Sequence, residues 1–211
     1  MELSVIVSGG VEGLLDESVL ARLLRELRAV PGHVYGRKGK NALLGAIPGY
    51  NRAAHHQPWV VPIDLDATED CVPDYRQQCL ADPARHMVFR IVVREIESWL
   101  MADAEKLAEF LAVPLRNIPD NPEALLNPKE VLVDVARRSR RRDIREDMVP
   151  RPGSGRAVGP AYTSRLIEFV QIEWRPHVAV ERSNSLHKCL IRMEELVQRH
   201  RGGRRSSQHE R

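Results

Sequence analysis

The stretch Trp59-Val60-Val61-Pro62-Ile63-Asp64-Leu65-Asp66 decides how the rest of the chain is interpreted. Its first five residues are apolar, which predicts a buried strand, and two acids follow directly. Open α/β sheets hold their sites at the carboxyl ends of their strands. Two carboxylates at i and i+2 share a face and repel each other unless a proton or cation lies between them. Asp64 and Asp66 therefore indicate either a site for a divalent ion or a polar loop.

Two further apolar runs, Leu3–Val7 and Met87–Val93, predict strands, and a weaker strand starts near His33. Helical spacing of apolar residues follows each of them, with Asp16 expected to cap the first helix and Pro31-Gly32 to end it. Ser8-Gly9-Gly10 predicts a turn after the first strand. This alternation predicts an α/β fold with a mostly parallel sheet flanked by helices.

Beyond Val113 the composition changes, because prolines interrupt the chain and helical patterns replace strands. Asn127-Pro128-Lys129-Glu130 has the residues of a helix start. We expect an α/β core over residues 1–113, a helical extension packed on it over 114–198, and a disordered basic tail over 199–211.

The net charge of +3 does not indicate a nucleic-acid-binding protein by itself, since the tail from residue 199 carries five arginines and one glutamate. Three cysteines without paired spacing support neither a disulfide framework nor a zinc site. The sequence shows no secretory signal and no apolar run that could cross a membrane, so we expect a cytoplasmic protein without a membrane partner.

Acidic residues follow several of the predicted strands, and in a parallel sheet the ends of those strands meet at one edge. Such carboxylates suit magnesium or manganese, and two ions of this kind can support phosphodiester cleavage. A solvent-facing helix charge is the simpler interpretation for at least one of Glu95, Glu97 and Asp103. The candidate metal ligands are Glu12, Asp16, Asp64, Asp66, Glu95 and Glu97.

Glu12-Gly13 before Asp16-Glu17, and later Asp64-Leu65-Asp66 after a strand, resemble the glutamate and aspartate motifs of Toprim domains. The chain resembles more closely the bacterial Toprim-like proteins of domain-of-unknown-function family 4276. The segments that carry this closer resemblance are Arg94–Asp103, Asn127–Glu130 and Ser183–Leu186.

The resemblance implies a Toprim-like, Rossmann-like fold and a nuclease that uses magnesium or manganese. It also implies antiphage defence together with a separate ATPase. By analogy with the overcoming-lysogenisation-defect nucleases, Asp16 would join Glu12 at a metal and Lys129 would assist. The catalytic candidates are Glu12, Asp64, Asp66 and Lys129.

Two groups of basic residues are candidates for contact with the phosphates of DNA or RNA, including transfer RNA. An exposed helix end balanced by neighbouring acids explains the second group equally well. The candidates are Arg37, Lys38 and Lys40 in one group and Arg137, Arg138, Arg141 and Arg142 in the other.

Three other functions remain open. Asp64 and Asp66 also resemble the nucleophile and general acid of haloacid-dehalogenase-like phosphatases, although the glutamates at Ile91–Glu97 replace that family's later aspartates. The chain would alternatively be a catalytically dormant partner of an ATPase, since it has no phosphate-binding GxxxxGK[ST] loop of its own. A nucleic-acid-binding module without cleavage is the third.

Overall fold

The structure is a computed structural model that describes residues 4–65 and 71–206. The chain forms two compact units. The first contains Met1–Ile63, Glu69–Ile91 and His187–Arg211, and the second contains Asp64–Thr68 and Val92–Leu186. The expected boundary at residue 113 is therefore replaced by crossings where the third and fourth strands end.

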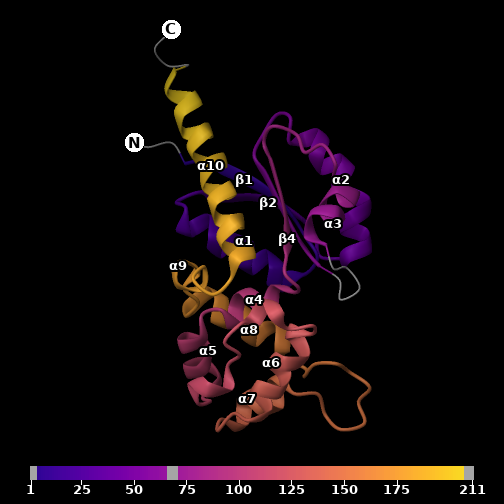
Figure 1. The fold of residues 1–211 in the computed structure, drawn as a ribbon, viewed down its shortest axis with the longest axis vertical. Coiled ribbons are helices and arrows are strands. Elements are labelled where there is room, and N and C mark those ends of the chain that lie inside the picture. Colours follow the sequence, from indigo (N-terminus) through magenta and orange to yellow (C-terminus); the bar gives the residue numbers. More distant parts are fainter. Residues whose placement is uncertain (1–3, 66–70, 207–211) are drawn as a thin grey trace. The chain divides into compact units, whose positions relative to one another are not determined.

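The sheet of the first unit has four parallel strands in the order β2-β1-β3-β4 (Figure 1). This arrangement confirms the predicted α/β, Rossmann-like fold, because parallel strands need helical crossovers on the faces of the sheet. The strands are β1 (Ile6–Val11), β2 (Val30–Gly36), β3 (Trp59–Asp64) and β4 (Met87–Val92).

Glycines in β1 let two helices approach the sheet closely. A Cβ atom at Gly9 would lie 2.5 Å from Leu20 of α1 (Leu14–Glu26), and one at Gly10 would lie 2.7 Å from Tyr50 of α2 (Lys40–Ala53). The predicted turn at Ser8-Gly9-Gly10 is thus wrong, since these residues belong to the strand. Glu12 consequently follows β1 directly.

Two details of the first predicted helix also differ. Gly13, rather than Asp16, occupies the position before α1, and Asp16 lies in its first turn, where a negative charge is favourable. Pro31 and Gly32 lie inside β2 instead of ending the helix. Strand pairing with β1 has overridden the local helix-ending signal.

The remaining helices of the first unit are α3 (Val72–Cys79) and the part of α10 (Asn184–Ser206) that starts at His187. Arg201 on α10 donates hydrogen bonds of 2.9 Å to the carbonyls of Leu27 and Arg28, just after α1. The helix therefore continues into the segment expected to be a disordered tail. Residues 207–211 of that tail lie outside the described residues.

The second unit is helical around two buried tryptophans. Trp99 donates from Nε1 to Ser185 Oγ at 2.7 Å, and Trp174 donates from Nε1 to the Trp99 carbonyl at 3.3 Å. These bonds satisfy the polar groups of large apolar side chains. Its elements are α4 (Ile96–Met101), α5 (Ala104–Leu111), η1 (Leu115–Asn117), η2 (Pro122–Ala124), α6 (Pro128–Arg137), α7 (Arg142–Met148), α8 (Tyr162–Ile172) and α9 (Pro176–Ala179).

Asp103, between α4 and α5, is fully buried rather than solvent-facing. It accepts hydrogen bonds from the Arg175 backbone at 2.8 Å and from its Nη2 at 2.7 Å. A buried carboxylate needs such a partner, because an unpaired charge is costly in the protein interior. Asp103 therefore has a structural role in the second unit.

No helix in the described part of the chain is long and apolar enough to cross a membrane.

Candidate functional site

A glutamate and a lysine of the second unit form the centre of the candidate site. Glu95 immediately precedes α4, and its carboxylate accepts hydrogen bonds from the Lys129 backbone N–H at 2.8 Å and from Lys129 Nζ at 3.2 Å. Lys129 lies in the first turn of α6, where free backbone N–H groups favour a carboxylate. The predicted helix start is therefore also what locks Lys129 to Glu95.

Glu97 lies beneath this pair and is only 1% exposed. Its Oε1 atom accepts a hydrogen bond from the Tyr162 hydroxyl at 3.2 Å and lies 3.7 Å from Lys129 Nζ. Its Oε2 atom is buried without a hydrogen-bond partner. Burial raises the pKa of Glu97, and Glu95 adds to the increase, while the Lys129 ammonium opposes it. Tyr162 likewise has a raised pKa because of burial and the neighbouring Glu97.

Lys129 combines a firmly held charge with access to solvent, since 41% of its side chain is exposed. Burial of the rest opposes the ammonium form, but the negative charges of Glu97 and Glu95 outweigh it and raise the pKa of Lys129. Asp64, the last residue of β3, contributes to the same increase. The site thus presents one positively charged donor among three acids.

The described residues do not complete a metal site. No group of three or more histidine, cysteine or acidic side chains that could hold a metal occurs within residues 4–65 and 71–206. Glu95 and Glu97 instead face the Lys129 ammonium. Asp66, one of the predicted ligands, lies outside the described residues.

Glu12 and Asp16, the other predicted ligands, belong to the first unit. Glu12 follows β1, and its carbonyl accepts a hydrogen bond from the Gly39 N–H at 3.0 Å. Asp16 is 8% exposed in the first turn of α1. The structure therefore brings Asp64, Glu95, Glu97 and Lys129 together in one unit, while Glu12 and Asp16 lie in the other.

The basic residues near β2 differ in what they already contact. Arg37 forms a forked ion pair with Glu17, with 2.6 Å between Nη2 and Oε1. Lys40 Nζ lies 4.9 Å from the ring centre of Tyr75. Lys38 is exposed. Phosphate contact by Arg37 would have to compete with a carboxylate, so Lys38 is the more accessible candidate.

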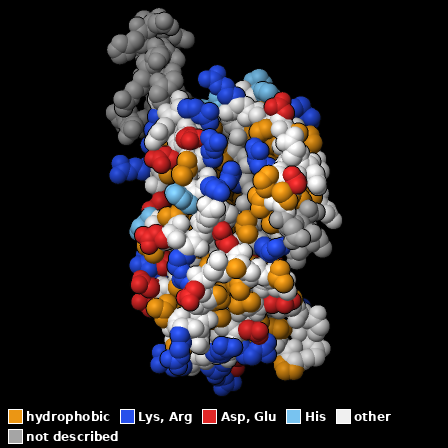
Figure 2. Space-filling view, viewed as in Figure 1, with side chains coloured by type: hydrophobic (Ala, Val, Ile, Leu, Met, Phe, Trp, Pro, Cys, Tyr) orange, Lys and Arg blue, Asp and Glu red, His pale blue; other side chains and the backbone are white. Residues whose placement is uncertain are grey.

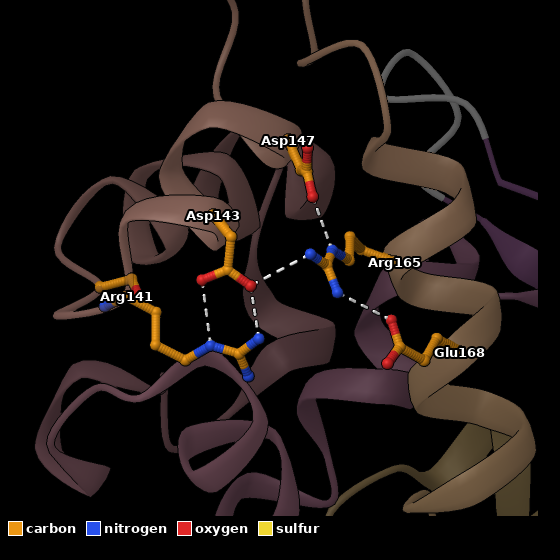
Figure 3. A network of polar contacts seen from close by, with 6 residues as sticks. Arg141, Asp143, Asp147, Arg165 and Glu168 are labelled. Carbon is orange, nitrogen blue, oxygen red and sulfur yellow. Dashed lines mark hydrogen bonds and ion pairs between the residues drawn. The ribbon is translucent and has the colours of Figure 1, made fainter.

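The arginines around α7 are largely balanced by local acids, as one of the two interpretations predicted. Figure 3 shows Arg165 contacting Asp147 at 2.7 Å, Glu168 at 3.0 Å and Asp143 at 3.1 Å, while Arg141 also contacts Asp143. Arg142 pairs with Glu146 at 2.7 Å and Arg137 lies 3.6 Å from Asp134, whereas Arg138 is exposed.

A hollow of about 720 Å³ opens beside this network. Four arginines and two acids contribute to its lining, so it has a positive balance that suits phosphate groups. The charged residues that line it are Arg137, Arg142, Arg145, Arg151, Glu146 and Asp147.

Sequence reasoning missed Tyr162 and Arg165. Tyr162 was recognised only as a helix start, and a lone tyrosine carries no signal that it reaches a glutamate 65 positions earlier. Arg165 lies outside the arginine-rich run, although its three acidic partners come from α7 and its own helix. Contacts between helices decided both roles.

Comparison of the chain with family models, with curated proteins and with solved structures gives no match. The family resemblance therefore stays a prediction.

Proposed function

We propose that the chain is a Toprim-type nuclease that hydrolyses phosphodiester bonds of nucleic acids. The observation that carries the proposal is the half-exposed Lys129 ammonium, held by Glu95 and Glu97 next to Asp64 at the end of β3. A fixed cation of this kind stabilises the negative charge that develops on a phosphate in the transition state. Its accessibility distinguishes it from the buried Asp103–Arg175 pair.

The three neighbours of Lys129 have separate roles in this proposal. Lys129 contacts a phosphate oxygen, because its side chain is the accessible one. Glu95 anchors both the backbone and the ammonium of Lys129, and the buried Glu97 supports the ammonium from below. Tyr162 positions Glu97 through its hydroxyl. Glu95, Glu97 and Tyr162 are thus positioning residues, and Lys129 is the catalytic residue.

Magnesium or manganese remains part of the proposal through the resemblance, with Asp64 and Asp66 as carboxylate ligands of the type these ions prefer. Because the described residues do not form a complete ligand group, no catalytic step is assigned to the metal. The hollow lined by Arg137, Arg142 and Arg151 supports a nucleic-acid substrate, since arginines contact backbone phosphates without regard to sequence.

The test is an assay of the purified full chain on DNA, RNA and transfer RNA, in magnesium, in manganese and in a chelator, with and without the neighbouring ATPase. We expect cleavage that Lys129→Met lowers by roughly 10²–10³-fold in kcat/KM, the loss typical of removing one transition-state donor. The matched control is Lys106→Met, because Lys106 also pairs with acids, Glu109 at 2.6 Å and Glu173 at 3.9 Å, away from this site.

Equal activity of Lys129→Met and the unmodified protein would refute the site. Hydrolysis of small phosphate esters through a trapped aspartyl phosphate would show the phosphatase instead. Binding of the ATPase without hydrolysis in any combination of metal and substrate would indicate a dormant partner, and binding of nucleic acid alone would indicate a binding module.

A further inference from the structure

Three arginines of the first unit lie close together around β4. Arg90 is on β4, Arg76 on α3 and Arg192 on α10. Burial lowers the pKa of Arg90, and the positive charges of Arg76 and Arg192 lower it further. Like charges that perturb one another in this way require proximity, so elements far apart in sequence bring three guanidinium groups to one place.

Two of these arginines have buried donors that nothing satisfies. The Nε atoms of Arg76 and Arg90 are inaccessible and make no hydrogen bond. Neither side chain forms an ion pair with any residue that the structure describes. Arg192 is different, because it is exposed and pairs with Glu195 at 2.8 Å. A buried polar group without a partner is rare in native proteins and indicates a partner from outside the chain.

The nearest candidate for an internal counter-ion is uncharged. Cys189 on α10 lies beside Arg90, and a thiolate there would compensate the guanidinium. Burial, however, raises the pKa of Cys189 to about 12, and its Sγ atom lies 3.8 Å from Met193 Sδ. The thiol therefore remains neutral at physiological pH.

The surroundings add positive charge. Figure 2 shows Lys and Arg side chains gathered over the part of the first unit where α10 and β4 lie in Figure 1. Further along the same strand and helix, His86 and His200 pack edge to face at 4.5 Å, with Arg85 and Arg199 close to His86. The field along this seam attracts anions.

We propose that Arg76 and Arg90, assisted by Arg192, form a binding site for a phosphate group. The planar guanidinium fork matches phosphate oxygens and gives paired, charge-assisted hydrogen bonds, and a phosphate brings enough acceptors for several arginines. A bound phosphate would satisfy the two buried Nε donors and compensate the clustered charge. The phosphate comes either from a free nucleotide or from the end of a nucleic-acid strand, and the site does not depend on hydrolysis at Lys129.

Thermal unfolding of the full chain tests the site in phosphate-free buffer. The probes are inorganic phosphate, adenosine monophosphate, and a short oligonucleotide with either a 5′-phosphate or a 5′-hydroxyl group. We expect Tm to rise by roughly 3–6 °C at a ligand concentration about ten times the dissociation constant. A response to the mononucleotide assigns the site to a free nucleotide, and one confined to the 5′-phosphorylated strand assigns it to a strand end.

The variants are Arg76→Met and Arg90→Met, each of which should abolish the rise. Without ligand, Arg90→Met should keep or raise Tm, because it removes an uncompensated, partly buried charge. The control Arg22→Met should retain the full ligand response, since Arg22 pairs with Glu26 at 3.1 Å elsewhere in the same unit. The Lys129→Met protein should also respond, which separates this site from the proposed hydrolytic one.

Two results would overturn the proposal. One is the absence of a Tm rise with every phosphate probe. The other is a rise of equal size in the unmodified protein, Arg76→Met and Arg90→Met.

Discussion

The lysine–glutamate cluster of the second unit and the arginine cluster of the first unit treat buried charge in opposite ways. Lys129 faces two carboxylates within 3.7 Å, and Asp64 adds a third negative charge. Arg90 faces two other arginines and a neutral thiol. The comparison teaches that a compensated cluster is already organised by the fold, whereas an uncompensated one depends on a partner from outside.

The two clusters also differ in how their residues are supplied. Glu95 and Glu97 come from adjacent positions at the start of α4, and Lys129 comes from the start of α6, where the helix geometry holds it. The arginines come from three separate elements, each with its own place in the first unit. Pre-positioned charge favours catalysis, while convergent, uncompensated charge favours binding of an anion.

The largest expected effect on stability comes from breaking full compensation in the second unit. Arg175→Met leaves the buried Asp103 without its charged partner, and we expect a loss of about 3–5 kcal/mol in the free energy of unfolding. Urea denaturation measures it. The control Arg142→Met breaks an exposed pair and should cost no more than about 1 kcal/mol. Equal losses in the two variants would contradict the importance of burial.

An intermediate effect is expected from Tyr162→Phe. The variant removes the hydroxyl that donates to Glu97 at 3.2 Å and leaves a buried acceptor without that bond. We expect a loss of about 1–3 kcal/mol in unfolding free energy, measured by urea denaturation. The pKa of Glu97 should rise further, because the tyrosine bond lowers it. Unchanged stability would mean that Tyr162 does not support the cluster.

The smallest effect concerns the cationic seam of the first unit. Burial lowers the pKa of His86, and His200, Arg85, Arg199 and His55 lower it further. The folded state therefore binds this proton less readily than the unfolded state does. Stability is lost as pH falls from about 6.5 through the lowered pKa.

His86→Gln should reduce the difference in unfolding free energy between about pH 7.5 and about pH 5. The exposed His56 provides the control, since His56→Gln should leave that difference as it is in the unmodified protein. The same pH dependence in His86→Gln and the unmodified protein would exclude this role for His86.

Much of the fold was predictable because strand and helix periodicities are local. The apolar run before Asp64 became β3, and Asn127-Pro128 marks the start of α6 as expected. The errors fall where tertiary packing overrides local signals. Gly9 and Gly10 looked like a turn, yet they are strand residues that make room for α1 and α2.

For the candidate site, the sequence identified most of the participants but not their environments. It singled out Glu95, Glu97 and Lys129, and the structure places all three together. It treated Glu97 and Asp103 as possible surface charges, although both are buried. Burial could not be predicted because it depends on which helices cover those positions.

The sequence by itself determined the alternation of strands and helices and the position of Asp64 at a strand end, since both depend on patterns within a few residues. Only the tertiary structure decided that the Lys129 charge is answered and the Arg90 charge is not. Charge compensation depends on which side chains meet across elements separated by tens of residues, and their proximity is a property of the packed chain.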